Sequence, residues 1–234
     1  MPRNLWPSFI HPVMAYFRRR RFAKLLRLEP NLLSSKILDL GGSVHFWEEI
    51  GINLAAHDIT LLNIAADGQS TNTKGDDVSS TITLYDGVTI PWPERHFDWV
   101  LCNSVIEHVP PQQREEFSSE IHRVGKGYVV QTPAFVFPIE PHFVVPFLHW
   151  LPRSIGRRVA RFGLWALLRR REKADFERYF DEVHLLRLKE FKAYFPSAQI
   201  VTERFGFLPK SYTAMERKVY PAEKGVARSA AAGK

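Results

Sequence analysis

The residues with the clearest capacity for chemistry are an acid and two glycines near the start of the chain. Asp39 lies inside the apolar run of residues 37–40, and Gly41 and Gly42 follow at once. A carboxylate at the end of a buried strand can accept hydrogen bonds from a ligand amine, and glycine lets the backbone approach a ligand without a Cβ in the way. The phosphate-loop pattern Gly-x4-Gly-Lys-Ser/Thr and the dinucleotide pattern Gly-x-Gly-x-x-Gly are both missing here. These residues therefore predict a ligand site at a strand end.

A second group of chemically capable residues is built on histidine. Glu107 and His108 follow the apolar run of residues 97–103, and His142 and His149 lie in a later aromatic stretch. Histidine has a suitable intrinsic pKa for a general base, which makes His108 a candidate and His142 or His149 its alternatives. A Glu-His pair can instead simply hold a loop or a cofactor. The nine histidines and one cysteine show no paired metal-ligand spacing, so the sequence predicts no metal site.

Apolar and β-branched runs indicate the elements that must position these groups. Predicted parallel strands lie within 36–43 and at 59–64, 81–85, 97–103 and 127–133, and a closing antiparallel pair at 199–204 and 211–217. Predicted helices span 13–28, 44–51, 110–124 and 183–195. Strand, glycine turn and helix at the first site form half of a nucleotide-binding unit, whose ligand lies at the carboxyl end of the strand.

Two motifs in the expected order resemble those of class I S-adenosylmethionine-dependent methyltransferases. The first is Ile-Leu-Asp-Leu-Gly at residues 37–41, and the second is Phe-Asp-x-Val at 97–100 followed by Glu-His at 107–108, as in the type 11 group. The resemblance covers roughly residues 30 to 218. It implies a Rossmann-like, seven-stranded, mostly parallel sheet with helices on both faces and an antiparallel closing pair. It also implies S-adenosylmethionine as cofactor.

The resemblance assigns cofactor contacts residue by residue. The first motif implies Asp39, Gly41, Gly42 and Ser43, although Ser43 and His45 stand where the family often has two further glycines. Asn103, at the end of the fourth strand, would face the methionine end of the cofactor.

Two further contacts depart from the family pattern or leave a choice. Asn63 occupies the place of an acid that bonds the ribose hydroxyls, and an uncharged amide bonds them more weakly. Asp86, followed by a Pro-aromatic-Pro turn, matches an acid that contacts the adenine amino group, with Asp76 or Asp77 as the alternatives.

The chain divides into three parts by composition. Residues 1–29 form a basic helical segment, predicted to be a lid beside the cofactor site or an amphipathic segment on an anionic membrane. Residues 30–218 form the methyltransferase domain, with a proline-rich, aromatic and then basic helical insertion at 134–180. The stretch after strand five is a predicted substrate wall or a plug on the core. Residues 219–234 are predicted to be a disordered tail.

Charge and cysteine content limit the partners and the compartment. The net charge is +7 and the pI about 9.6, which favours an anionic partner or surface. The single Cys102 excludes an internal disulfide and fits a reducing compartment. No apolar run reaches the roughly 18 residues of a transmembrane helix, and the N-terminus does not read as a signal peptide. A cytoplasmic protein, with peripheral contact to anionic membranes, is the prediction.

Together these features predict methyl transfer to a small-molecule acceptor, amphiphilic or anionic in character. DNA amino-methylating enzymes carry Asn/Asp-Pro-Pro-Tyr/Phe after the fourth strand, whereas residues 103–106 read Asn-Ser-Val-Ile, so no nucleic-acid partner is expected. The alternative is a non-catalytic binding or membrane-peripheral module that retains the fold. The sequence leaves the acceptor atom, the identity of a general base and the oligomeric state open.

Overall fold

A computed structural model describes residues 10–64, 82–161 and 173–217 of the chain. Its centre is a seven-stranded sheet in the order β3-β2-β1-β4-β5-β9-β8. The parallel strands are β1 (Ile37–Leu40), β2 (Ile59–Ile64), β3 (Ile82–Tyr85), β4 (Trp99–Asn103) and β5 (Gly127–Pro133). Strands β8 (Gln199–Phe205) and β9 (Leu208–Arg217) close the sheet antiparallel. The predicted fold class is confirmed, closing pair included.

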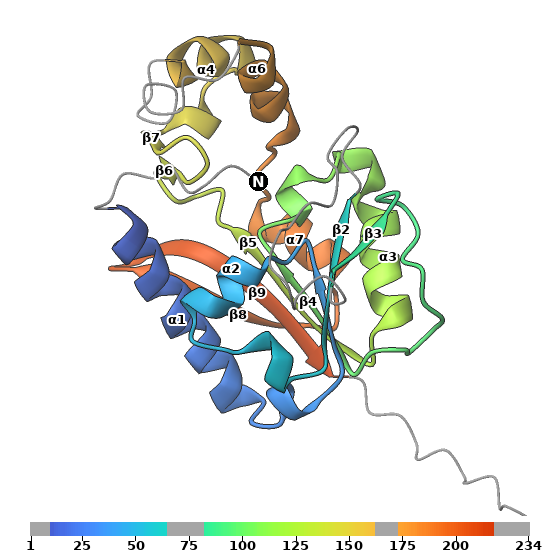
Figure 1. Cartoon of the computed structure of the whole chain (residues 1–234). Helices are drawn as coiled ribbons and strands as arrows, with labels where there is room; N and C mark the ends of the chain where they lie inside the picture. Colours follow the sequence, from blue (N-terminus) through green and yellow to red (C-terminus); the bar gives the residue numbers. More distant parts are fainter. Residues whose placement is uncertain (1–9, 65–81, 162–172, 218–234) are drawn as a thin grey trace, which may run out of the picture.

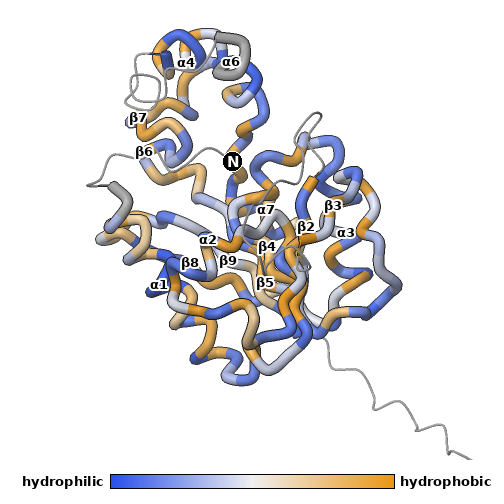
Figure 2. The backbone as a smooth tube through the Cα atoms, in the orientation of Figure 1, coloured by the Kyte–Doolittle hydropathy of each residue, from blue (hydrophilic) through white to orange (hydrophobic). Residues whose placement is uncertain are grey.

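Helices cover both faces of this sheet, because the side chains of each central strand alternate between two apolar layers. Leu38 and Leu40 belong to the layer under α3 (Arg114–Val124) and α7 (Leu188–Tyr194). Ile37 belongs to the layer under α1 (Ile10–Leu28) and α2 (Val44–Glu49). Figure 1 shows the two layers on either side of the sheet, and Figure 2 shows the hydrophobic strands between them. A strand buried on both faces reads as a continuous apolar run, as residues 37–40 do apart from Asp39.

Between β5 and α7 the chain builds a small cap lobe, which comprises residues 139–160 and 173–185. It contains β6 (Ile139–Glu140), β7 (Val145–Pro146), α4 (Arg153–Ala160) and α6 (Lys173–Glu182). Its own core includes Phe143, Leu148 and Phe180. In Figure 1 the lobe stands beyond the carboxyl ends of the parallel strands. The aromatic stretch predicted as a substrate wall or plug therefore belongs from Ile139 onward to a separate packed unit, whereas Ala134 and Phe137 pack with the main core.

Short 3-10 turns link these elements, and two predicted helices differ from the structure. The turns are η1 (Leu32–Ser34), η2 (Leu54–Ala56), η4 (Ile106–His108), η5 (Pro111–Gln113) and η6 (Leu148–Trp150). The helix predicted at 110–124 starts as η5 and becomes α3 at Arg114, because prolines open it.

The helix predicted at 183–195 is wrong over its first residues, since α7 begins at Leu188. Arginine side chains take the carbonyls that a helix would use: Arg153 donates to the Val183 carbonyl and Arg114 to the His184 carbonyl. Leu186 also bridges to Ala134. In the described ranges, no helix is both long enough and apolar enough to cross a bilayer.

Candidate active site

A cavity of about 330 Å³ opens at the carboxyl ends of β1 and β4. The strand order reverses between these two strands, and ligands of doubly wound sheets bind at such a point. Five of the seven predicted cofactor residues line the cavity: Asp39, Gly41, Gly42, Ser43 and Asn103. The fold thus gathers residues from two strands and one turn that lie far apart in the sequence.

Both glycines of the turn are required by their surroundings. Gly41 has φ +76°, the left-handed region that favours glycine, and a Cβ there would overlap the side chain of Val105. A Cβ on Gly42 would overlap the carboxylate of Asp39. Ser43 then caps α2, because the backbone N–H of Phe46 donates to its Oγ at 3.3 Å. The turn therefore brings bare backbone against the cavity.

Asp39 is a buried acid with one strong partner. Its side chain accepts a hydrogen bond from Trp47 Nε1 at 2.7 Å, and the residue is 2% exposed. Burial disfavours the carboxylate and raises the pKa of Asp39 to about 7, although the Trp47 hydrogen bond opposes the shift. The acid predicted from the strand pattern therefore lies in the cavity wall and is about half protonated near neutral pH.

Asn63 and Asp86 do not join the residues that line the cavity. Asn63 Nδ2 donates to the carbonyl of Gly42 at 2.9 Å, so its amide braces the glycine turn. The exposed Asp86 accepts from the backbone N–H groups of Val88 and Thr89 at 2.9 and 3.1 Å, which hold its pKa below the usual range. The alternatives for the adenine contact, residues 76 and 77, lie outside the described residues.

Helix α1 forms one wall of the cavity, and its role as a lid stays a prediction. Met14, Phe17, Arg18 and Arg21 line it. Arg21 Nη2 donates to the Oδ1 of Asn103 at 3.0 Å, which places a guanidinium on the predicted methionine-end residue. The basic residues at 18–21 marked the segment as a basic helix in the sequence, but they did not indicate which arginine faces the cavity.

Sequence reasoning missed several polar residues of the cavity wall. Ser104 has φ +58°, donates from Oγ to Gln131 Oε1 at 2.9 Å and turns the chain into the cavity after β4. Gln131 is a polar residue inside the apolar β5, and that pattern was a usable signal. Lys210 and Ser211 come from β9, and no pattern in the sequence around them indicated that they line the cavity.

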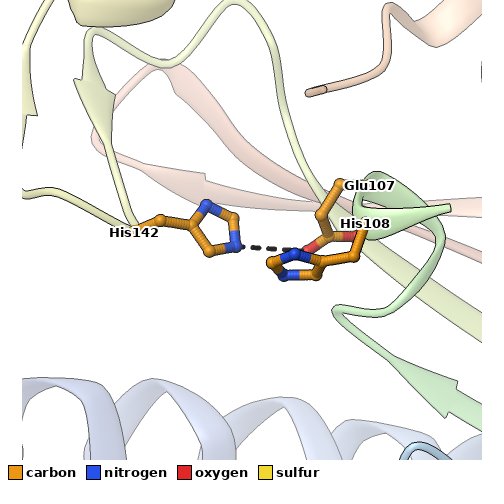
Figure 3. A group of neighbouring side chains, drawn as sticks. All are labelled: Glu107, His108 and His142. Atoms are coloured by element: carbon orange, nitrogen blue, oxygen red, sulfur yellow. Dashed lines mark ion pairs between the residues drawn. The ribbon is translucent and has the colours of Figure 1, made fainter. Parts of the chain in front are cut away.

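The two histidines predicted to be catalytic lie next to each other (Figure 3), and Pro141, adjacent to His142 in sequence, lines the cavity. Their ring centroids lie 4.8 Å apart in an edge-to-face arrangement. Glu107 lies with them, 0% exposed, and its Oε1 is 3.9 Å from His142 Nε2. On the other side of the ring, His142 Nδ1 bonds Glu140 Oε1 at 2.7 Å. His149 lies apart from this cluster and bonds the Phe135 carbonyl.

The two rings differ in their electrostatic environment. Burial, together with the neighbouring His142, lowers the pKa of His108 to about 3, so its ring is neutral at pH 7. Burial also disfavours protonation of His142, but the hydrogen bond and charge of Glu140 and the charge of Glu107 outweigh it and raise the pKa. Burial raises the pKa of Glu107, against the charge of His142 and a hydrogen bond from Thr132.

The fold and cavity define a doubly wound α/β protein with its ligand site at the switch point of the sheet. Residues 38–129 match the family model described as a methyltransferase domain. This segment includes the Glu-His motif and all but the first residue of the first motif, and over this span the chain matches a methyltransferase domain of the type 11-like family. S-adenosylmethionine is the cofactor that such a domain implies.

Two curated relatives match only part of the chain. The uncharacterized protein Rv1509 of Mycobacterium tuberculosis strain H37Rv is 37% identical over 54 residues, which cover 23% of this chain and 18% of that protein. The uncharacterized protein MT1557 of strain CDC 1551 gives the same values. The chain thus matches less than a fifth of the length of these relatives.

Solved structures similar to this chain include two methyltransferases. A SAM-dependent methyltransferase from Archaeoglobus fulgidus is 13% identical, with a TM-score of 0.48 over 86% of this chain and 94% of that chain. The small RNA methyltransferase HEN1 is 18% identical, with a TM-score of 0.48 over 87% of this chain and 25% of that chain.

Proposed function

We propose that this protein transfers the methyl group of S-adenosylmethionine to a small-molecule acceptor. The observation that carries the proposal is the cavity at the carboxyl ends of β1 and β4, walled by Asp39, the bare backbone of Gly41 and Gly42, and Asn103. The sulfonium of the cofactor supplies the reactive methyl group. The protein supplies in-line placement and a site shielded from water.

The rest of the cavity wall supports an acceptor with both apolar and anionic parts. Pro133, Ala134, Phe137, Ile139 and Pro141 make one side apolar. The cations of Arg18, Arg21 and Lys210 line the same cavity. An amphiphilic or anionic small molecule matches this combination better than a neutral polar one.

The proposed acceptor end lies toward the cap lobe. Pro141 lines the cavity and adjoins His142, which contacts His108. We therefore place the nucleophilic atom of the acceptor next to these two histidines. Their catalytic roles stay a prediction.

Calorimetric titration with S-adenosylmethionine and with its demethylated product tests the proposal. We expect a single site per chain. Absence of binding at millimolar cofactor would contradict methyl transfer and leave the alternative, a non-catalytic module with the same fold. The methyltransferase-domain match does not favour that alternative.

Two glycine variants make this test specific to the turn. Gly41 and Gly51 both have positive φ, so alanine at either costs about 1–2 kcal/mol of backbone strain. Only at Gly41 would the new Cβ also overlap a neighbour, because nothing lies within 4 Å of the position at Gly51. We expect Gly41→Ala to lower cofactor affinity at least tenfold and Gly51→Ala to leave it unchanged. Equal affinities in the two variants would place the cofactor elsewhere.

We also propose that the protein contacts anionic membranes peripherally and does not bind nucleic acid. Exposed apolar side chains gather beside the α1 wall of the cavity. Phe205 is 58% exposed, and its ring centroid lies 6.1 Å from that of Phe17, which lines the cavity. Phe207 follows it at the tip of the hairpin and is also exposed. Val13 and Tyr16 are exposed on α1 itself. Apolar residues beside basic ones favour an interfacial site on anionic lipid.

A further inference from the structure

The cluster formed by Glu107, His108 and His142 contains a carboxylate oxygen without a hydrogen bond. Glu107 is fully buried, and its Oε2 accepts a hydrogen bond from Thr132 Oγ1 at 3.0 Å. Its Oε1 has no hydrogen-bond partner among the described residues and points toward the two rings in Figure 3. A buried oxygen left in this way costs free energy unless a cation or a proton completes its environment.

The ring of His142 is held so that one of its nitrogens faces this oxygen. Glu140 Oε1 hydrogen-bonds His142 Nδ1 at 2.7 Å, and His142 Nε2 lies 3.9 Å from Glu107 Oε1. Glu140 is itself 2% exposed, and its Oε2 accepts from the backbone N–H of Phe143 at 2.7 Å. In metal sites, the ligating histidine commonly donates its other ring N–H to a carboxylate, which fixes the orientation of the ring. His108 offers a second imidazole nitrogen to the same cluster.

We propose that Glu107, His108 and His142 bind one divalent transition-metal cation. One ligand atom from each residue lies within 4.8 Å of the others. Ligand atoms of a tetrahedral site with bonds of about 2.1 Å lie about 3.4 Å apart, so side-chain rotations that bring the three atoms closer by up to about 1.4 Å would close the site. Two histidines and one carboxylate are a donor set that binds zinc or iron and leaves positions open.

An open position would give the cation a role in the reaction. Pro141, next to His142, lines the cavity, so a coordinated acceptor hydroxyl or carboxylate would be held at the acceptor end. A divalent cation favours the deprotonated form of a bound hydroxyl, which is the better methyl acceptor. This role rests on the proposed function, whereas metal binding itself does not.

Spacing along the chain could not reveal this site. Glu107 and His108 belong to η4, and His142 follows β6 in the cap lobe. Histidines and acids at such a distance in sequence carry no recognisable ligand pattern. For that reason the sequence predicted no metal, and the contact between the lobe and η4 creates the cluster.

The test uses the full chain, freed of metal with a chelator and without S-adenosylmethionine. Co²⁺ and Zn²⁺ are added separately, and binding is followed by equilibrium dialysis and, for Co²⁺, by visible absorption. We expect one equivalent per chain. His142→Gln and Glu107→Gln each remove a ligand and should lower affinity about 100-fold or more. Glu140→Gln removes only the support and should lower it about 10- to 100-fold.

His57→Gln is the matched control, because His57 Nδ1 bonds the Leu33 carbonyl just before the amino end of β2. It should bind the cation like the unmodified chain. Circular dichroism checks that each variant folds. If Glu107→Gln does not fold, Glu140→Gln still tests the proposal. Binding well below one equivalent, or an affinity that the cluster variants leave unchanged, would overturn the proposal. Cofactor titration of the metal-free chain reports separately on the proposed function.

Discussion

Asp39 is the residue whose burial and chemistry conflict most directly. It stands in a strand buried on both faces, yet it lines the cavity, where its carboxylate accepts a hydrogen bond from the indole of Trp47. Burial of the acid raises its pKa to about 7. Burying this acid lowers the free energy of unfolding. Such a cost is expected at a site that receives a cationic ligand, since groups with shifted pKa values are common at functional sites.

Asp39→Asn should change how stability depends on pH. Because the pKa of Asp39 is about 7 when folded and 3.8 in its model state, the folded chain binds the proton more tightly. The free energy of unfolding therefore falls as pH rises from about 4 to about 7, and this contribution is constant above that range. The variant lacks this term, so its stability relative to the unmodified chain should improve by about 2–4 kcal/mol between pH 4.5 and 8. Urea unfolding at several pH values measures it, and parallel pH curves would contradict the shift.

Asn63 is the residue where the family pattern and the local contacts point to different chemistry. Its Nδ2 donates to the Gly42 carbonyl, a role that a carboxylate cannot fill. We expect Asn63→Asp to destabilise the fold by about 1–3 kcal/mol and to weaken cofactor binding, because an unpaired carboxylate would face that carbonyl. Thermal unfolding and calorimetry measure both effects. Tighter cofactor binding in the variant would instead mean that an acid is the better residue for the ribose.

At the scale of elements, α1 packs on the domain through its apolar residues and several of its arginines. Its own Phe17 and Phe22 are buried, Arg18 pairs with Glu49 at 2.5 Å, and Arg21 bonds Asn103. Arg20 is exposed on the same helix. The basic character of the segment therefore has two sources, with inward arginines that build the cavity wall and outward ones that contribute surface charge.

Arg21→Ala and Arg20→Ala should separate these two sources. Arg21 is mostly buried and pairs with Glu203 at 3.4 Å, with side chains 19% and 14% exposed. Its loss should cost about 1–3 kcal/mol of unfolding free energy, toward the lower end because Lys210 and Ser211 still bond Glu203. Arg20→Ala should stay within about 0.5 kcal/mol. Urea unfolding compares them, and equal losses would show that α1 is not anchored through Arg21.

At the scale of the whole molecule, much of the positive charge of the cap lobe is neutralised inside the lobe. Arg153 and Arg157 both pair with Asp181, and Arg178 pairs with Glu182, while Arg161, just after α4, pairs with Glu177 of the lobe. These pairs are largely exposed and contribute little to stability. They do reduce the field that the described part of the lobe presents to a membrane. The proposed membrane contact is therefore expected at the α1 side of the cavity rather than at α4 and α6.

Phe207→Ser tests where the molecule meets lipid. Phe207 is 82% exposed at the β8–β9 hairpin, so its loss should leave stability unchanged within about 0.5 kcal/mol. Burial of a phenylalanine contributes about 1.5–3 kcal/mol, so binding to anionic vesicles should weaken about tenfold or more. Val88→Ser, beyond the strand at the opposite edge of the sheet, is the control. Co-sedimentation with anionic and neutral vesicles, beside a gel shift with DNA and RNA, measures it. Equal sedimentation of both variants would place the contact elsewhere, and indifference to both vesicle types would end the membrane proposal.

Local patterns in the sequence determined the sheet and the glycine turn. An apolar run buried on both faces, two glycines and a following helix start depend on residues within about a dozen positions of each other, so strand β2 at 59–64 and strand β5 at 127–133 match the predicted bounds. Asp39, Gly41, Gly42 and Ser43 line the cavity because the turn that carries them is itself local. The start of α7 was missed because distant arginines compete for its carbonyls.

Only the tertiary structure decided which groups meet. Glu107 and His108 reach His142 through the docking of the cap lobe, and Arg21 reaches Asn103 through the docking of α1. Such contacts join segments whose separation along the chain leaves no periodic or spacing signal, since each depends on the packing of a whole element. The same packing sets burial, and burial shifts the pKa values of Asp39 and His108 in opposite directions. The sequence alone thus determined the fold and one ligand turn, and the packing of α1 and the cap lobe decided the chemistry available around it.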